Sequence, residues 1–166
     1  MFITVHAAAA TILTKSIPNP FLAFLIGVLS HFVLDVIPHG DSRMGQRFWG
    51  HKLKFLQEKG ELKLMALYGS LDGVVLAFLL MFLFRNFEFT RADNVIWGIV
   101  GSILPDITVA IYKLKNFKVI KWFFNFHNKN HNLLVNKINF DFPLQYGVLM
   151  QAIVLAALTW TIYLIA

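Results

Sequence analysis

The stretch LKLMALYGSLDGVVLAFLLMFLF, residues 62–84, is long and apolar enough to decide the class of the fold. It exceeds the roughly 20 residues that a helix needs to cross the hydrocarbon core of a bilayer. The stretch PLQYGVLMQAIVLAALTWTIYLIA, residues 143–166, has the same character. Both predict membrane-spanning helices, because a helix satisfies all of its backbone hydrogen bonds without water.

Three more apolar segments, at 2–14, 20–38 and 94–112, accompany these two, and the first is short because Pro18 and Pro20 end it. Of the 166 residues, 57% are hydrophobic and 14% charged, more apolar than a soluble domain could bury. The segment FKVIKWFFNF, residues 117–126, mixes lysine with aromatics and predicts an interfacial helix. We therefore predict an all-α integral membrane bundle, a single domain over residues 1–166, with four or five transmembrane helices plus this interfacial helix.

Positive charge is distributed unevenly over the connections between these segments. Six Lys and Arg residues lie in or beside the connection 39–61, counted through Lys63, and six more lie in 113–142. The three basic residues on the opposite side are Lys15, Arg85 and Arg91. Under the positive-inside rule, this twelve-to-three distribution places both long connections in the cytoplasm.

The same rule accounts for the formal net charge of +6 without a nucleic-acid partner. The partners that we expect instead are the anionic headgroups of the inner (cytoplasmic) membrane. The first basic residue is Lys15, so the N-terminus lacks the charged region of a signal peptide. We expect it to be retained as a helix.

Ionisable side chains interrupt the apolar segments at one depth, within about 15 Å of the predicted cytoplasmic ends at 1.5 Å per helical residue. Six of these residues lie in or at the ends of the apolar segments: His6, His31, Asp35, His39, Asp72 and Asp106. Two more, His127 and His131, lie in the second long connection at the same depth. Such residues are costly in lipid, so they are normally functional or paired. The chain has no cysteine, which leaves nitrogen and oxygen ligands for a metal. Eight such groups exceed the four positions of one zinc, so we expect two or more ions of zinc or a similar divalent metal.

Spacing sharpens the metal-site prediction. His31, Asp35 and His39 follow one another at intervals of four residues, and His127 and His131 share that interval. On a helix this interval places side chains on one face, where two of them can chelate one cation or an acid can orient a histidine.

The segment GSILPDI, residues 101–107, adds Asp106 beside Pro105, which we expect to break the helix and free backbone groups at a cavity. Asp72 and Asp41 are the candidates for the general base of a catalytic site. Taken singly, Asp72 could pair with a basic residue, His6 could be a packing residue, and His51 and Asp41 are surface residues by position.

The motifs SHFVLDVIPHGD (residues 30–41) and GSILPDI, with a later His-x-x-x-His, resemble those of membrane-bound, metal-dependent hydrolases of the YdjM type, a group similar to zinc-dependent phospholipase C. In this resemblance, His31 and Asp35 match a ligand pair and Asp106 matches a Pro-Asp ligand. The chain departs from it at HNKNHN, where YdjM-type proteins read His-Arg-x-x-Thr-His-Ser, and in lacking a glutamate ligand. The resemblance implies an all-helical, zinc-dependent enzyme that hydrolyses phosphoesters.

The expected function is hydrolysis of a phospholipid or another amphiphilic phosphoester by a metal-activated water, with Lys129 and Arg43 attracting the headgroup. Two alternatives from other classes remain: a transporter of divalent ions or protons, and a membrane scaffold with a structural metal. The transporter is disfavoured because the outer halves of the spans carry no comparable polar residues. The segment HGDS contains the Gly-Asp-Ser of one lipase family, but no Asp-x-x-His partner for Ser42 exists.

The charge distribution predicts a cytoplasmic N-terminus and a C-terminus on the outer side. A reporter that is active only outside the cytoplasm, fused after Ala166, is expected to be active. A reporter that is active only in the cytoplasm should be silent at the same position. The reverse pair of results would remove one span, and with it the predicted placement of His6.

Overall fold

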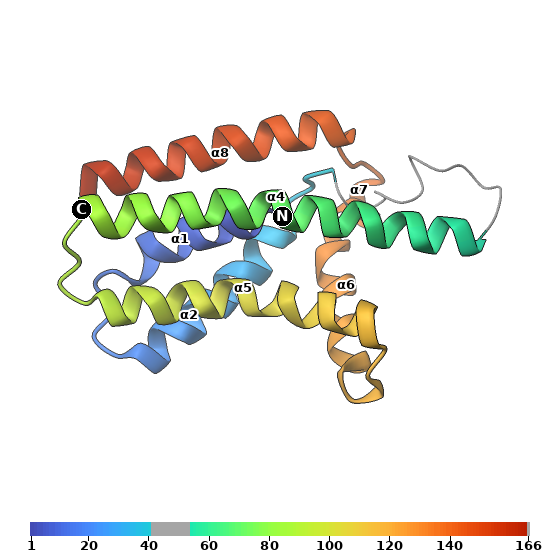
Figure 1. Ribbon diagram of the computed structural model, residues 1–166, viewed down its shortest axis with the longest axis horizontal. Helices are drawn as coiled ribbons and strands as arrows, with labels where there is room; N and C mark the ends of the chain where they lie inside the picture. Colours follow the sequence, from blue (N-terminus) through green and yellow to red (C-terminus); the bar gives the residue numbers. More distant parts are fainter. Residues whose placement is uncertain (41–53, 166) are drawn as a thin grey trace.

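The computed structural model of the protein describes residues 1–40 and 54–165, and all regular secondary structure in that part is helical (Figure 1). The elements are α1 (Ile3–Thr14), α2 (Pro20–Asp35), α4 (Lys54–Asn86), α5 (Ala92–Lys115), the 3₁₀ turn η1 (Lys118–Ile120), α6 (Lys121–His131), α7 (Leu133–Ile138) and α8 (Leu144–Ile165). The predicted all-α bundle is confirmed. The second long connection, 113–142, is largely helical, because α6 and α7 occupy most of it. Helix α4 begins at Lys54, before the predicted apolar segment 62–84.

Three helices are long and apolar enough to cross a membrane: Met65–Asn86 within α4, the whole of α5, and α8. They run along the long axis of the molecule in Figure 1. The apolar helices α1 and α2 are shorter, with 12 and 16 residues. At 1.5 Å per residue they extend about 18 and 24 Å, less than a hydrocarbon core of about 30 Å. The protein is therefore a membrane protein in which α1 packs among the three long helices, whereas α2 packs against α5 and α1.

Helix α1 lies at the centre of the bundle and contacts α2, α4, α5 and α8. Its alanines make this possible, because Ala7, Ala8 and Ala10 are fully buried and allow neighbouring helices to approach. One cluster joins Ala7 and Ala10 to Val95 and Ile99 of α5. A second cluster joins Ala8 to residues of α4 and α8. The shortest of the predicted apolar segments is thus the core of the fold.

Pro105 lies inside α5, which continues unbroken from Ala92 to Lys115. The expectation that Pro105 breaks the helix is therefore wrong. Proline removes one backbone donor from a helix, and neighbouring helices can compensate for that loss. Here α2 packs along this part of α5, and the side chain of His31 contacts the backbone carbonyl of Ser102.

Helices α2 and α5 cross at glycines. A Cβ atom added to Gly27 would lie 2.1 Å from the backbone oxygen of Gly98, and one added to Gly101 would lie 2.2 Å from that of Phe24. Small residues at such crossings let two backbones approach closely. Because His31 is one turn beyond Gly27 and Ser102 one turn beyond Gly98, this crossing brings the two residues into contact.

Substitution of Gly27 by Ala should force α2 and α5 apart, since its Cβ would meet backbone rather than a movable side chain. We expect a loss of about 1–3 kcal/mol of stability, the usual cost of overpacking. Thermal unfolding in detergent measures it. The matched control is Gly69→Ala, whose Cβ meets nothing within 4 Å; it should be as stable as the wild type or more so. Equal stability of Gly27→Ala and wild type would contradict the close crossing.

Candidate metal centre

Asp35, the last residue of α2, is fully buried and lies at the centre of a group of polar side chains. Its Oδ1 lies 3.1 Å from Nε2 of His6 and 2.9 Å from the nitrogen of Met1. Its Oδ2 lies 3.2 Å from Nε2 of His31 and 3.3 Å from Nε2 of His127. A carboxylate is tolerated in such a place only where nearby groups compensate its charge.

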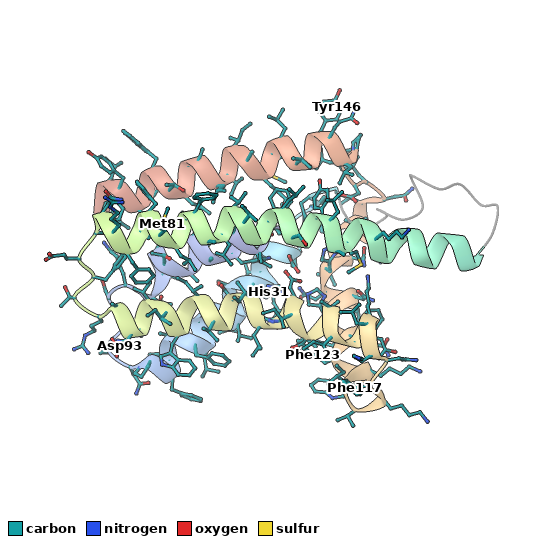
Figure 2. The ribbon with its side chains drawn as sticks, viewed as in Figure 1. His31, Met81, Asp93, Phe117, Phe123 and Tyr146 are labelled. Carbon is teal, nitrogen blue, oxygen red and sulfur yellow. The ribbon has the colours of Figure 1, made fainter. Side chains whose placement is uncertain are left out.

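Four side chains from three helices form the first candidate metal-binding group. Their ligand atoms all lie within 4.8 Å of one another, and the residues are His31, Asp35, Asp106 and His127. In Figure 2 the labelled His31 lies near the middle of the molecule, and Asp93 lies at the start of α5, far from α6. Helix α6 is held here in part by Asn130, whose Nδ2 donates a 2.8 Å hydrogen bond to the backbone oxygen of Phe32.

The tautomer of His31 prepares it to bind a cation. Its Nδ1 lies 2.9 Å from the backbone oxygen of Ser102, and a carbonyl oxygen can only accept, so Nδ1 must carry a proton. In the neutral imidazole, Nε2 then presents a lone pair. That lone pair faces Nε2 of His127 at 3.0 Å and Oδ2 of Asp35 at 3.2 Å. These three atoms need a proton or a metal ion between them, and a backbone carbonyl is a common partner for the other nitrogen of a metal-binding histidine.

The spacing of the four ligand atoms fits a divalent ion. Ligands 2.0–2.2 Å from a tetrahedral zinc lie about 3.3–3.6 Å from one another. Oδ1 of Asp106 lies 3.4 Å from Nε2 of His127 and 3.9 Å from Nε2 of His31. Oδ2 of Asp35 lies 3.2 Å from Nε2 of His31 and 3.3 Å from Nε2 of His127, so the observed distances lie on both sides of the expected range. Two histidines and two carboxylates are a donor set that zinc and similar metals accept.

The electrostatic environment also favours a cation. Burial by itself lowers the pKa of the His127 imidazole, but hydrogen bonds with Asp106 and Asp35 outweigh burial and raise the pKa to about 9. The positive form of His127 is therefore stabilised by the two carboxylates. The same two carboxylates would stabilise a bound metal ion at this position.

A second candidate group shares Asp35 with the first and adds His39 and His131. The rings of His39 and His131 lie with their centroids 4.7 Å apart. Nδ1 of His39 lies 2.6 Å from the backbone oxygen of Ile37 and must donate to it, which directs Nε2 to serve as a ligand atom. Asp35 therefore stands between two sets of histidines.

The N-terminal part of α8 holds His39 in place. Gly147 approaches so closely that an added Cβ would lie 2.1 Å from the backbone oxygen of His39. Buried Gln151 donates a 3.2 Å hydrogen bond from Nε2 to that same oxygen, and its Oε1 accepts one of 2.6 Å from the backbone of Phe2. Helix α8 thereby connects the turn that carries His39 to the start of α1.

The structure brings together six of the eight predicted metal ligands, and the other two, His6 and Asp72, belong to neither group. His6 contacts Asp35, and its ring lies 4.2 Å from that of His31. Asp72 accepts hydrogen bonds from the backbone of Ile3 at 2.6 Å and of Thr4 at 3.2 Å. It therefore caps the N-terminus of α1, where a negative charge is favourable. Asp41, the other candidate base, lies outside the described residues.

Sequence reasoning missed the residues that orient the ligands: Ser102, Asn130 and Gln151. Ser102 and Gln151 act through the packing of helices far apart in the sequence. One sequence pattern could have predicted the Ser102 contact. Gly98, Gly101 and Ser102 are small residues at helical spacing, which is typical of a close helix crossing.

Comparison with known proteins finds no matching family model, no matching curated protein and no matching solved structure. The interpretation of the site therefore rests on its geometry.

Because Asp35 belongs to both groups, its substitution should affect metal binding in both, whereas substitution of His127 or His131 should affect one group only. We expect elemental analysis of purified protein to find a divalent metal, with most of it lost in Asp35→Asn. His127→Ala and His131→Ala should each lose only part of it, because each removes a ligand from one group. Asp72→Asn is the control: it weakens the cap of α1 and should keep its metal. Metal content that survives Asp35→Asn and His31→Ala in folded protein would contradict this ligand set.

Proposed function

We propose that the protein is a membrane-embedded, metal-dependent hydrolase that acts on a phosphoester, with zinc or a similar divalent ion. A relationship to YdjM-type membrane hydrolases and to zinc-dependent phospholipase C, suggested by the sequence motifs, is part of this proposal. The observation that carries it is the position of Asp35, whose carboxylate is common to both candidate metal-binding groups. A carboxylate shared in this way suits two neighbouring ions, the arrangement that many phosphoester hydrolases use.

Ions bound there would supply an acidified water as nucleophile and neutralise the charge that develops on the phosphate. The residues of the chain have separate tasks. His31, Asp106 and His127 would hold one ion with Asp35, and His39 and His131 would hold the second. Ser102 fixes the tautomer of His31. Asp41 remains the candidate for accepting the proton of the nucleophile, since the oxygens of Asp72 already accept hydrogen bonds from α1.

Exposure indicates the side from which a substrate would reach the site. The side chains of His31, Asp35 and His127 are 0%, 1% and 5% exposed, whereas that of Asp106 is 25% exposed. Asp106 lies in α5, a helix that can cross the membrane. Access beside Asp106 favours a substrate that resides in the membrane, such as a phospholipid or another amphiphilic phosphate.

The orientation and location of the site belong to the same proposal. The positive-inside distribution of Lys and Arg supports a multi-pass protein of the cytoplasmic membrane with the site facing the cytoplasm. Anionic headgroups would then be drawn to the basic residues near the site, of which Lys129 lies in α6 between His127 and His131. In Figure 2, Phe117 and Phe123 lie at the α6 end of the molecule. Aromatic residues beside lysines suit a helix in the headgroup region.

The rival functions, a transporter or a scaffold with a structural metal, use the same ligands differently. A transit site needs a polar path to the far side of the bilayer. At the opposite end of the bundle, Leu83 and Ile162 pack with Ala8 in an apolar cluster. A structural metal needs no opening, whereas the most exposed ligand of the first group is Asp106. Both observations favour the hydrolase.

Removal of Asp106 should abolish hydrolysis in detergent, where no ion gradient exists. The loss should exceed about a hundredfold in rate, because metal-assisted transition-state stabilisation is worth several kcal/mol. The assay offers phospholipids and prenyl phosphates, with and without added zinc, to wild type and Asp106→Ala. Asp93→Asn is the matched control, since Asp93 is an acid at the other end of the same helix. No turnover by fully metallated protein, together with ligand-dependent uptake of zinc or protons into proteoliposomes, would replace the hydrolase with the transporter.

A further inference from the structure

Helix α6 has two faces of different character. On the face toward the bundle, His127 is 4% exposed and Asn130 donates a hydrogen bond to the backbone of Phe32. The opposite face carries Trp122 and Phe126, which lie one turn apart and are 69% and 51% exposed. We call this opposite face the outer face of α6. Its residues are all exposed and consist of Lys121, Trp122, Asn125, Phe126 and Lys129.

The charge on and around the outer face is positive. Residues 107–140 contain six lysines and no acidic residue. Exposed apolar side chains lie among these lysines, since Phe117 is 54% and Val119 82% exposed. Four of the lysines are exposed and belong to the end of α5, to η1 or to α6: Lys115, Lys118, Lys121 and Lys129. A surface that combines lysines with aromatic and aliphatic side chains is complementary to a leaflet of anionic lipid, which is charged at its surface and apolar beneath it.

The outer face lies at the depth of the lipid headgroups. Nζ of Lys113, in the last turn of α5, lies 3.2 Å from Sδ of Met65, where the apolar part of α4 begins. These two helices, both able to span a membrane, therefore reach its surface at the same level. Helix α6 begins at Lys121, shortly after α5 ends at Lys115, and runs across the direction of the long helices (Figure 1). An amphipathic helix with this position and direction lies in the headgroup region.

The same helix carries two of the candidate metal ligands, His127 and His131. Nε2 of His127 lies 3.4 Å from Oδ1 of Asp106 and 3.3 Å from Oδ2 of Asp35. Helix α6 has only 11 residues, and within the bundle it contacts α2 and α5. Whatever fixes the position of α6 therefore also fixes two of the six candidate ligands.

We propose that the outer face of α6 binds anionic lipid headgroups and that this binding holds His127 and His131 in the metal centre. The lysines contact the headgroup phosphates, the aromatic rings lie at the boundary with the acyl chains, and α6 is held between the leaflet and the bundle. Because lipid and metal stabilise the same position of α6, each strengthens the binding of the other. The inference rests on the proposed metal centre and adds its dependence on lipid composition.

Quenching of Trp122 by brominated lipid tests the docking without reference to metal. The protein is placed in nanodiscs of equal amounts of phosphatidylcholine and phosphatidylglycerol, with one or the other lipid brominated near the headgroup end of its chains. The signal of Trp122 is the difference between the wild type and Trp122→Phe. We expect brominated phosphatidylglycerol to quench this signal about twice as much as brominated phosphatidylcholine, because the lysines enrich the anionic lipid around α6.

A pair of double variants tests the role of the charge. In Lys118→Gln/Lys121→Gln, both brominated lipids should quench Trp122 equally. The matched control, Lys118→Arg/Lys121→Arg, keeps both positive charges and should retain the preference. Lys129 stays unchanged because it lies between two candidate ligands. Equal quenching in the wild type, or a preference that survives undiminished without the two lysines, would overturn anionic lipid as the occupant. Quenching by neither lipid would show that the outer face points away from the membrane.

Zinc affinity tests the link between the lipid and the metal centre. It is measured by competition with a fluorescent chelator for the wild type and Lys118→Gln/Lys121→Gln in the same nanodiscs, so that zinc attracted by the lipid itself affects both equally. In phosphatidylglycerol the wild type should bind zinc about tenfold more tightly than the variant, because lysines near an anionic surface hold α6 there. In phosphatidylcholine the variant should bind at least as tightly as the wild type. Direct repulsion predicts the opposite order in phosphatidylglycerol, since the loss of two positive charges favours a cation.

The outcomes separate this inference from the proposed function. Zinc affinity in phosphatidylglycerol that is equal in the two proteins, or higher in the variant, would overturn the link to the metal centre and leave the ligand set intact. Zinc binding by neither protein in either lipid would contradict the metal centre itself, and the link with it. The quenching of Trp122 would still decide whether the outer face of α6 binds anionic lipid.

Discussion

The burial of the Asp35 carboxylate is the constraint on which the rest of the structure depends. A carboxylate in an apolar bundle is strongly unfavourable unless cations or donors surround it. Asp35 is fully buried, and groups from α1, α2 and α6 lie within 3.3 Å of its two oxygens. Those helices must therefore converge at one point. The convergence that compensates the charge is also what assembles the candidate metal centre.

The helix packing can be understood from this requirement. Alanines make α1 narrow enough to lie at the centre of the bundle, where His6 reaches Asp35. Glycines at the crossing of α2 and α5 bring His31 against Ser102, which fixes the tautomer that a metal ligand needs. Helix α8 makes its own close approach at Gly147 and secures the turn that carries His39. Small residues at each crossing thus set the positions of the polar ones.

Much of the architecture could be predicted from the sequence, because long apolar runs and four-residue spacing are local signals. They predicted the helical membrane bundle and the facing of His31 toward Asp35. Four or five spans were expected, and three helices of the described residues are long and apolar enough to be spans. Contacts between distant segments were not predictable in this way. Asp72 shares the depth and residue type of the ligands, yet it caps α1, because only the folded chain shows that the backbone of Ile3 and Thr4 reaches it. Pro105 was expected to break α5, but a helix packed against its neighbours can tolerate the loss of one donor.

We propose above that Asp35 is a ligand shared by two metal ions. The measurement that tests it most directly is anomalous diffraction at the zinc absorption edge from crystals of zinc-loaded protein. Two peaks are expected to flank the Asp35 carboxylate, one among His31, Asp106 and His127 and the other beside His39 and His131. A map with no peak at Asp35, in crystals shown by fluorescence to contain zinc, would contradict it.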